Sequence, residues 1–276
     1  MSIPKTNVRG LQNVRTHSGK VDQIMEKKAS QQKGKYLYAV IEGTDNRTYG
    51  EIGINSGLVY LIPNGRISAV VSDVPNQKLR PERRQLAAHQ EVLKRLMEEC
   101  TPLPMSFGII AEGSKAVQKI LTRNQKEFIK ELHRVNGKVE MGLRVTLDVP
   151  NIFDYFVSTH PELRSARDRF FGSKREPSQE DKIELGRMFG RMLNEDRETH
   201  TEKVEEVLSR YCSEIKRNLC RKEADVMNLA CLVERKAGKQ FEEGILEAAN
   251  LFDNNFAFDF NGPWAPHNFV EIDLEF

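Results

Sequence analysis

The feature that most constrains the fold of this chain is a stretch without proline that runs from Ser178 to Leu219. Ser178 is followed three residues later by Asp181, which is the spacing of a capping box at a helix N-terminus. Apolar residues recur three and four positions apart on both sides of a wholly polar segment, 194–203, and no turn residue interrupts them. The sequence therefore predicts one long projecting helix, 178–219; two shorter helices are the alternative.

The residues around this helix alternate between strand-like and helix-like patterns. Apolar residues occupy every second position in Lys138–Asp148, and three phenylalanines share one face of Phe256–Phe260. Between them, the patterns predict helices at 150–172 and 239–250 and a strand at 225–235. The order of elements predicts an α+β fold in which residues 138–260 form a ferredoxin-like domain, with the long helix as an insertion.

A separate N-terminal α+β domain is predicted for residues 35–137. Its expected strands are Lys35–Glu42, Gly57–Ile62, Arg66–Ser72 and the short Met105–Ala111. The second and third form a hairpin, because Pro63-Asn64-Gly65 between them is a turn signal. The expected helices are Pro81–Cys100 and Ser114–Val135.

The first 34 residues are predicted to be a disordered basic leader. Residues 1–35 carry eight basic and two acidic side chains, whereas the whole chain has a formal net charge of only +2. Few apolar residues are available there to build a core. Aromatic residues that could stack on bases are absent between the charges, so nucleic-acid binding is not expected.

Signatures of catalysis, metal binding and membrane insertion are absent from the sequence. The four cysteines form no CxxC pair, no two histidines are three to five residues apart, and no nucleotide-binding or hydrolase motif occurs. His89 lies in an apolar helix stripe and is expected to be a hydrogen-bonded core residue; a functional role is the alternative. No apolar run is long enough to span a membrane. We therefore predict no enzyme, no catalytic residue, no metal and no cofactor.

Four segments resemble the gas vesicle protein family GvpF/GvpL. Residues 262–269, Gly-Pro-Trp-Ala-Pro-His-Asn-Phe, resemble a GPW-x-P-x-x-F signature near the end of those chains, although Ala265 and His267 depart from it. Residues 102–108, Pro-Leu-Pro-Met-Ser-Phe-Gly, resemble the family's strand after the first helix. Tyr36–Val40 and Lys138–Val145 are similar to its opening and junction strands. In the same order as in the family, these segments cover about residues 35–273.

The resemblance implies a minor gas-vesicle component without catalytic activity, located in the cytoplasm at the gas vesicle. Its implied partners are the hydrophobic shell subunit and other gas-vesicle accessory proteins. It would bind the shell subunit and limit its aggregation during nucleation and assembly. A generic helical scaffold or adaptor protein unrelated to gas vesicles is the alternative.

Candidate contact residues follow from how such a partner could bind. Strand addition at a sheet edge would use the apolar strand residues Leu37, Tyr38, Val40, Val59 and Leu61. The long helix offers Gly186 and Gly190, whose spacing suits close approach of another element, either within the chain or from a partner. The tail, residues 261–276, is expected to dock on the body through Trp264, Pro266 and Phe269, with Trp264 buried.

Overall fold

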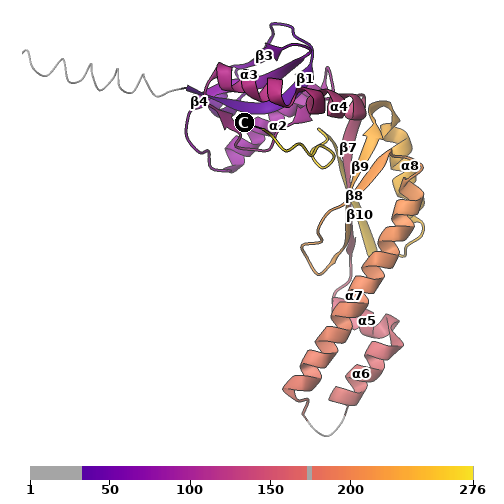
Figure 1. The fold of residues 1–276 in the computed structure, drawn as a ribbon. Coiled ribbons are helices and arrows are strands. Elements are labelled where there is room, and N and C mark those ends of the chain that lie inside the picture. The colour runs from indigo at the N-terminus through magenta and orange to yellow at the C-terminus, as the bar shows by residue number, and fades with distance from the viewer. Residues whose placement is uncertain (1–32, 173–175, 276) are drawn as a thin grey trace, which may run out of the picture.

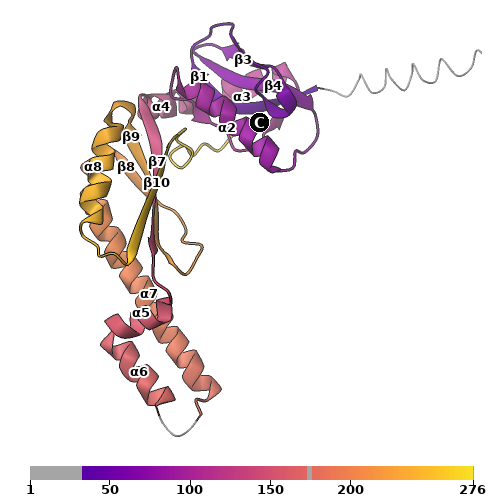
Figure 2. The ribbon, with the colours of Figure 1, turned by 180° about the vertical axis from the view of Figure 1, so that it is seen from behind.

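The computed structural model describes residues 33–172 and 176–275. Within them the chain forms two antiparallel sheets, and a helical arm extends from the second sheet away from the first (Figure 1). The same arrangement is seen from behind in Figure 2. The predicted leader lies outside the described residues, except that Lys33 and Gly34 already belong to the first strand.

The first sheet is built around its opening strand. Its strands are β1 (Lys33–Glu42), β2 (Thr48–Gly50), β3 (Val59–Asn64), β4 (Ile67–Pro75), β5 (Leu103–Pro104) and β6 (Ile110–Ala111). They lie in the order β2-β3-β4-β1-β5, and β6 also pairs with β1. A short 3-10 helix, Ile54–Ser56, connects β2 to β3. The predicted hairpin is β3–β4, but its turn is Gly65-Arg66, because Asn64 still pairs with Ile67 and Gly65 has a φ of +62°.

Two predictions about this region are wrong in detail. The segment Met105–Ala111 is not one strand. The two short strands that pair with β1 are β5, just before the segment, and β6, its last two residues, and the chain between them bends at Gly108, whose φ is +95°. The helix predicted at 114–135 is broken at Asn124, which has φ −99° and ψ 10°. The helices of this half are α2 (Arg83–Met97), α3 (Ser114–Arg123) and α4 (Gln125–Val135).

The second sheet lies in the segment predicted to be ferredoxin-like, residues 138–260, and contains one strand, Glu214–Arg217, that the sequence did not predict. Its strands are β7 (Lys138–Leu147), β8 (Glu214–Arg217), β9 (Asp225–Glu234) and β10 (Phe256–Trp264), in the order β10-β7-β9-β8. Helices between β7 and β8, and α8 (Gly238–Ala249) between β9 and β10, complete the β-α-β-β-α-β order of a ferredoxin-like unit. A 3-10 turn, Arg235–Ala237, precedes α8.

The long helix is α7 (Gln179–Leu208), which at 1.5 Å per residue is about 45 Å long. Both bonds of the predicted capping box are present between Ser178 and Asp181. The helix ends at Leu208 and not at Leu219, because Glu214–Arg217 pair with β9 as strand β8. The predicted helix at 150–172 is two helices, α5 (Ile152–Thr159) and α6 (Pro161–Phe171), separated where Pro161 starts a new helix. They pack against the first half of α7, with the Phe156 and Phe189 rings 5.4 Å apart.

The buried residues form one cluster between the second sheet and its helices and two further clusters at the first sheet. The cluster on the α3–α4 side of the first sheet also contains Ala230 and Leu232 of β9, together with Phe269 from the tail. The two sheets are therefore joined by shared apolar packing. A division into two independent domains, at residue 137 or elsewhere, stays a prediction.

A candidate binding groove between helix α2 and the Gly-Pro-Trp segment

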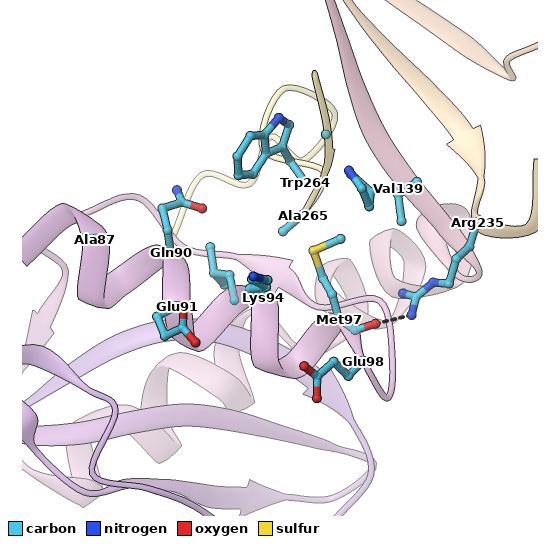
Figure 3. A pocket seen from close by; sticks show the side chains of 13 residues that line it. Ala87, Gln90, Glu91, Lys94, Met97, Glu98, Val139, Arg235, Trp264 and Ala265 are labelled. Atoms are coloured by element: carbon cyan, nitrogen blue, oxygen red, sulfur yellow. Dashed lines mark hydrogen bonds between the residues drawn. The ribbon is translucent and has the colours of Figure 1, made fainter. Parts of the chain in front are cut away.

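An open groove of about 610 Å³ lies where the two sheets meet. One wall is a stripe of α2 that runs from Ala87 to Glu98, about 16 Å along the helix. The other wall is Gly262–Ala265, at the end of β10 (Figure 3). Leu93 and Val139, both buried, also line it. The groove is therefore built by one helix of the first half and one strand end of the second.

The second wall depends on an irregularity in β10. Its pairing with β7 shifts between Asn261 and Trp264, and Gly262 at the shift has a φ of +126°. A Cβ atom on Gly262 would lie 2.8 Å from Sδ of Met141 and 3.0 Å from the Glu140 carbonyl oxygen. Only glycine fits this backbone position without displacing β7.

Trp264 is directed toward the groove and not into the core. Its side chain lines the groove with Met97 on the facing helix (Figure 3), and 45% of the residue's surface is exposed. The indole N–H donates to Oδ1 of Asn261 at 2.7 Å, so its polar group is satisfied within the same strand end. The prediction that Trp264 is buried is wrong, because the bulge in β10 turns the ring outward.

Arg235 closes one end of the groove and ties α2 to the second sheet. Its guanidinium donates to the carbonyl oxygens of Met97 and Cys100, the latter at 2.8 Å, and to Oγ1 of Thr101 at 3.3 Å. These carbonyls lie at the C-terminal end of α2, where helical partners are lacking and a cation is favourable. Sequence reasoning missed Arg235; its position as the last residue of the predicted strand 225–235 was the only signal.

A buried aromatic cluster links α2 to the tail. His89 of α2 is 2% exposed, and its Nδ1 lies 2.8 Å from the Tyr36 hydroxyl. The His267 ring of the tail is 6.4 Å from the His89 ring. Burial, with a smaller contribution from His267, lowers the pKa of His89 to about 4. His89 is thus a neutral core histidine at neutral pH, the first of its two predicted roles.

The other predicted tail residues, Pro266 and Phe269, are both buried, Phe269 with 2% exposure. Phe269 packs with Leu132, Val135 and the β9 residues of the shared cluster. The role of these two residues in docking the tail stays a prediction. The tail crosses from β10 toward the first sheet in both views (Figures 1 and 2).

The predicted strand-edge contacts are not at an edge. Leu37, Tyr38 and Val40 are fully buried in β1, which has β4 on one side and β5 and β6 on the other. Val59 and Leu61 are buried in β3, between β2 and β4. Strand addition at these residues is therefore excluded, because their backbone neighbours are already present.

Gly186 and Gly190 lie on α7, in the arm and away from the groove. A methyl group added to either would meet no atom within 4 Å outside the helix's own backbone. Of the two alternatives, close packing within the chain is therefore not found among residues 33–172 and 176–275. Their contact with a partner stays a prediction.

Among residues 33–172 and 176–275, no three His, Cys, Asp or Glu side chains are placed to hold a metal ion. In the same part of the chain, no helix combines the length and apolar character needed to cross a membrane.

Comparison with known families gives a match over most of the chain. The family model described as gas vesicle synthesis protein GvpL/GvpF matches residues 34–271. Gas vesicle protein F of Streptomyces sp. (strain CB03234) is 29% identical over 226 residues, covering 80% of this chain and 92% of the relative. Gas vesicle protein L of the same strain is 25% identical over 259 residues, covering 86% and 93%.

Two solved structures share the fold. The crystal structure of gas vesicle protein GvpF from Anabaena sp. PCC7120 has a TM-score of 0.76 at 22% identity, covering 87% of this chain and 99% of that one. GvpF from Microcystis aeruginosa has a TM-score of 0.72 at 20% identity, with the same coverage. The mixed fold with two antiparallel sheets is thus confirmed. Nothing in these likenesses points to catalysis.

Proposed function

The chain belongs to the GvpL/GvpF family of gas vesicle synthesis proteins, and on that basis we propose that it binds the hydrophobic gas-vesicle shell subunit and limits its aggregation during nucleation and assembly. It acts as a non-enzymatic accessory protein, in the cytoplasm and at the gas vesicle, together with other accessory proteins. Family membership argues against a generic scaffold or adaptor unrelated to gas vesicles.

The observation that carries this proposal is the open groove with Trp264 in its wall. A tryptophan that is 45% exposed beside Met97 and Pro263 is a large apolar surface available to a partner. Tryptophan is also among the residues that contribute most to binding energy at protein interfaces. An unassembled shell subunit exposes apolar surface to water, which is unfavourable. Covering this surface would lower the tendency of the subunit to self-associate.

The dimensions of the groove favour a helical segment of the shell subunit. The α2 stripe from Ala87 to Glu98 is about 16 Å long, which corresponds to about three turns of a helix laid beside it. An amphipathic helix would insert its apolar stripe between Met97 and Trp264 and keep its polar face in water. Charged residues of α2 at the groove, among them Glu91, Lys94 and Glu98, would border the polar face.

Co-expression with a tagged shell subunit tests the proposal. We expect the wild-type chain to be retained with the tagged subunit and to reduce the fraction of that subunit found in the insoluble pellet. Trp264→Ala should weaken both effects. Phe171→Ala is the matched control, because Phe171 is an equally exposed aromatic residue, at 48%, located at the end of α6 in the arm. If the wild type is not retained above an empty-tag control, the proposal is overturned. If retention falls equally in both variants, the groove is not the binding site.

A further inference from the structure

The groove wall that carries Trp264 continues into a segment that is held by contacts with several other elements. We call this segment, Ala265–Glu275, the strap. Ala265 is 2% exposed and packs in the core cluster of α2, and the strap then runs over residues of both sheets. Its first contact with the second sheet is made by a buried carboxylate, Glu140 of β7, which has no part in the groove lining.

Glu140 holds the strap through both carboxylate oxygens. The backbone N–H of Asn268 donates to Oε2 at 2.8 Å, and its side-chain amide donates to Oε1 at 2.6 Å. Glu140 is only 7% exposed, and a buried carboxylate is unfavourable unless such bonds compensate it. Burial raises the pKa of Glu140, and the two bonds from Asn268 oppose that rise. The pair is therefore a specific buried contact that binds the strap to β7.

The same residue of β7 is also the backbone neighbour of Trp264. In the register of β10 and β7, Trp264 lies opposite Glu140. Only Ala265, Pro266 and His267 separate Trp264 from Asn268, and the first two are buried. Because this connection is short and packed, it has little conformational freedom. A shift of Asn268 would therefore also move Trp264.

Beyond Asn268 the strap is held independently. Arg134 of α4 donates to the Phe269 carbonyl oxygen and is itself paired with Glu131 and Glu214, each at 2.6 Å. At the far end, Glu275 and Asn124 exchange two hydrogen bonds, each 3.1 Å long. Loss of the Glu140 contact would therefore loosen the start of the strap while its end stays attached.

We propose that the Glu140–Asn268 pair is the positioning element of the groove: it holds the Trp264 wall at its separation from α2 and thereby sets the affinity for the shell subunit. This inference rests on the proposed function for its binding consequence. Its structural consequence, the placement of Trp264, is independent of any partner. A strap that only stabilises the fold would leave Trp264 unchanged when the pair is altered.

A swap of the two side chains tests this proposal. Asn268→Asp puts a carboxylate against the Glu140 carboxylate and removes the side-chain donor, whereas Glu140→Gln alone keeps a neutral amide–amide hydrogen bond once the Asn268 amide turns over, and loses only the charge. In the double variant, the amide at 140 donates to the carboxylate at 268, and its oxygen still accepts the backbone N–H. We therefore expect Asn268→Asp to break the contact, Glu140→Gln to weaken it only slightly, and the double change to restore what Asn268→Asp breaks. Glu271→Gln is the control, because this exposed strap carboxylate pairs with Lys216 on the surface and has no bond to Glu140 or Asn268 among the described contacts.

The readouts are intrinsic fluorescence and retention of the shell subunit. Trp264 is the sole tryptophan, so its emission maximum and acrylamide quenching report the groove wall directly. We expect Asn268→Asp to change these signals well below its unfolding temperature and to weaken retention about tenfold, the usual effect of losing one hydrogen bond to a charged group, whereas Glu140→Gln should have a smaller effect. The double variant should recover both, and the control should match the wild type.

The outcomes distinguish a failure of the positioning role from a failure of the proposed function. If the wild type does not retain the shell subunit, the proposed function fails, while the fluorescence comparison still decides the positioning role. Unchanged Trp264 signals in a correctly folded Asn268→Asp variant would overturn the positioning role, even if its melting temperature falls. Should Asn268→Asp fail to fold, Asn268→Ser keeps the test intact, because it removes the side-chain amide bond and leaves the backbone bond in place.

Discussion

The junction between the two sheets and the helical arm are held together in different ways. At the junction, Glu140 and Asn268 are 128 positions apart in the sequence, and Arg235 and Met97 are 138 apart. In the arm, α5, α6 and the first half of α7 follow one another and pack through neighbouring residues such as Phe156 and Phe189. The junction, which contains the groove, therefore depends on the end of the chain, whereas the arm depends on local sequence.

The largest expected effect on stability comes from removing the main apolar side chain of the strap. Phe269→Ala should destabilise the protein by about 3–5 kcal/mol, because a fully buried phenylalanine leaves a cavity between elements of both halves. Chemical denaturation measures this, and Phe171→Ala at the exposed end of α6 is the control, with an expected effect below about 1 kcal/mol. Comparable losses in the two variants would contradict the central role of the strap.

Acid should weaken the junction through His89. Its pKa is lowered to about 4 in the folded chain, against 6.5 in the unfolded one, so the unfolded state binds a proton first as the pH falls. The stability contributed by neutral His89 is present above pH 6.5 and is lost as the pH falls toward 4. Between pH 7 and pH 5 we expect a loss of about 1–2 kcal/mol from this group.

Denaturation at a series of pH values measures the contribution of His89. His89→Gln should reduce the slope between pH 7 and pH 5, and the part that stays is expected from His267 and His200, because burial also lowers the pKa of each. An unchanged slope in His89→Gln would show that other groups cause the acid sensitivity.

A smaller effect confined to the arm is expected from the capping box of α7. Ser178→Ala removes the side-chain acceptor for the Asp181 N–H and should cost about 1 kcal/mol. Hydrogen exchange should become faster in the first turn of α7, while Trp264 fluorescence stays the same because the junction is not involved. A change in Trp264 emission would mean that the arm and the groove are coupled.

The smallest effect sharpens the role of the arm. Gly186→Ala and Gly190→Ala should each stabilise the protein by up to about 1 kcal/mol, because alanine is the better helix former and the added methyl group meets open space. Thermal unfolding measures the gain. If either variant also reduces shell-subunit retention, these glycines contact the partner; unaltered retention would leave them without a binding role.

Most elements were predictable because their signals are local. The alternation of Lys138–Asp148 and the capping box at Ser178 identified β7 and the start of α7 without reference to other parts of the chain. The failures were at places where pairing with a distant strand decided the outcome. Glu214–Arg217 became β8 because β9 was available beside it, and Leu103–Pro104 became β5 because β1 was.

The candidate site was less predictable than the fold. The Gly-Pro-Trp segment was identified as a family feature, but Trp264 was assigned to the core, although the bulge at Gly262 turns it toward α2. Arg235 and Glu140 were not singled out, since a single charged residue in a strand is common. Their roles appear only when the end of α2 and the strap lie beside them.

The sequence by itself determined the periodicity of each segment, the start of the long helix and the family to which the chain belongs. The periodicity and the helix start follow from backbone propensities and side-chain spacing within a few turns or residues, whereas the family follows from the resemblance of short motifs such as residues 262–269. Only the tertiary structure decided which strands are edges, that Trp264 is exposed, and that a strap from the end of the chain is held by Glu140. Those outcomes depend on contacts between separate segments of the chain, more than a hundred positions apart for Trp264 and the strap, and such contacts form only when packing and hydrogen bonding across the whole molecule are satisfied together.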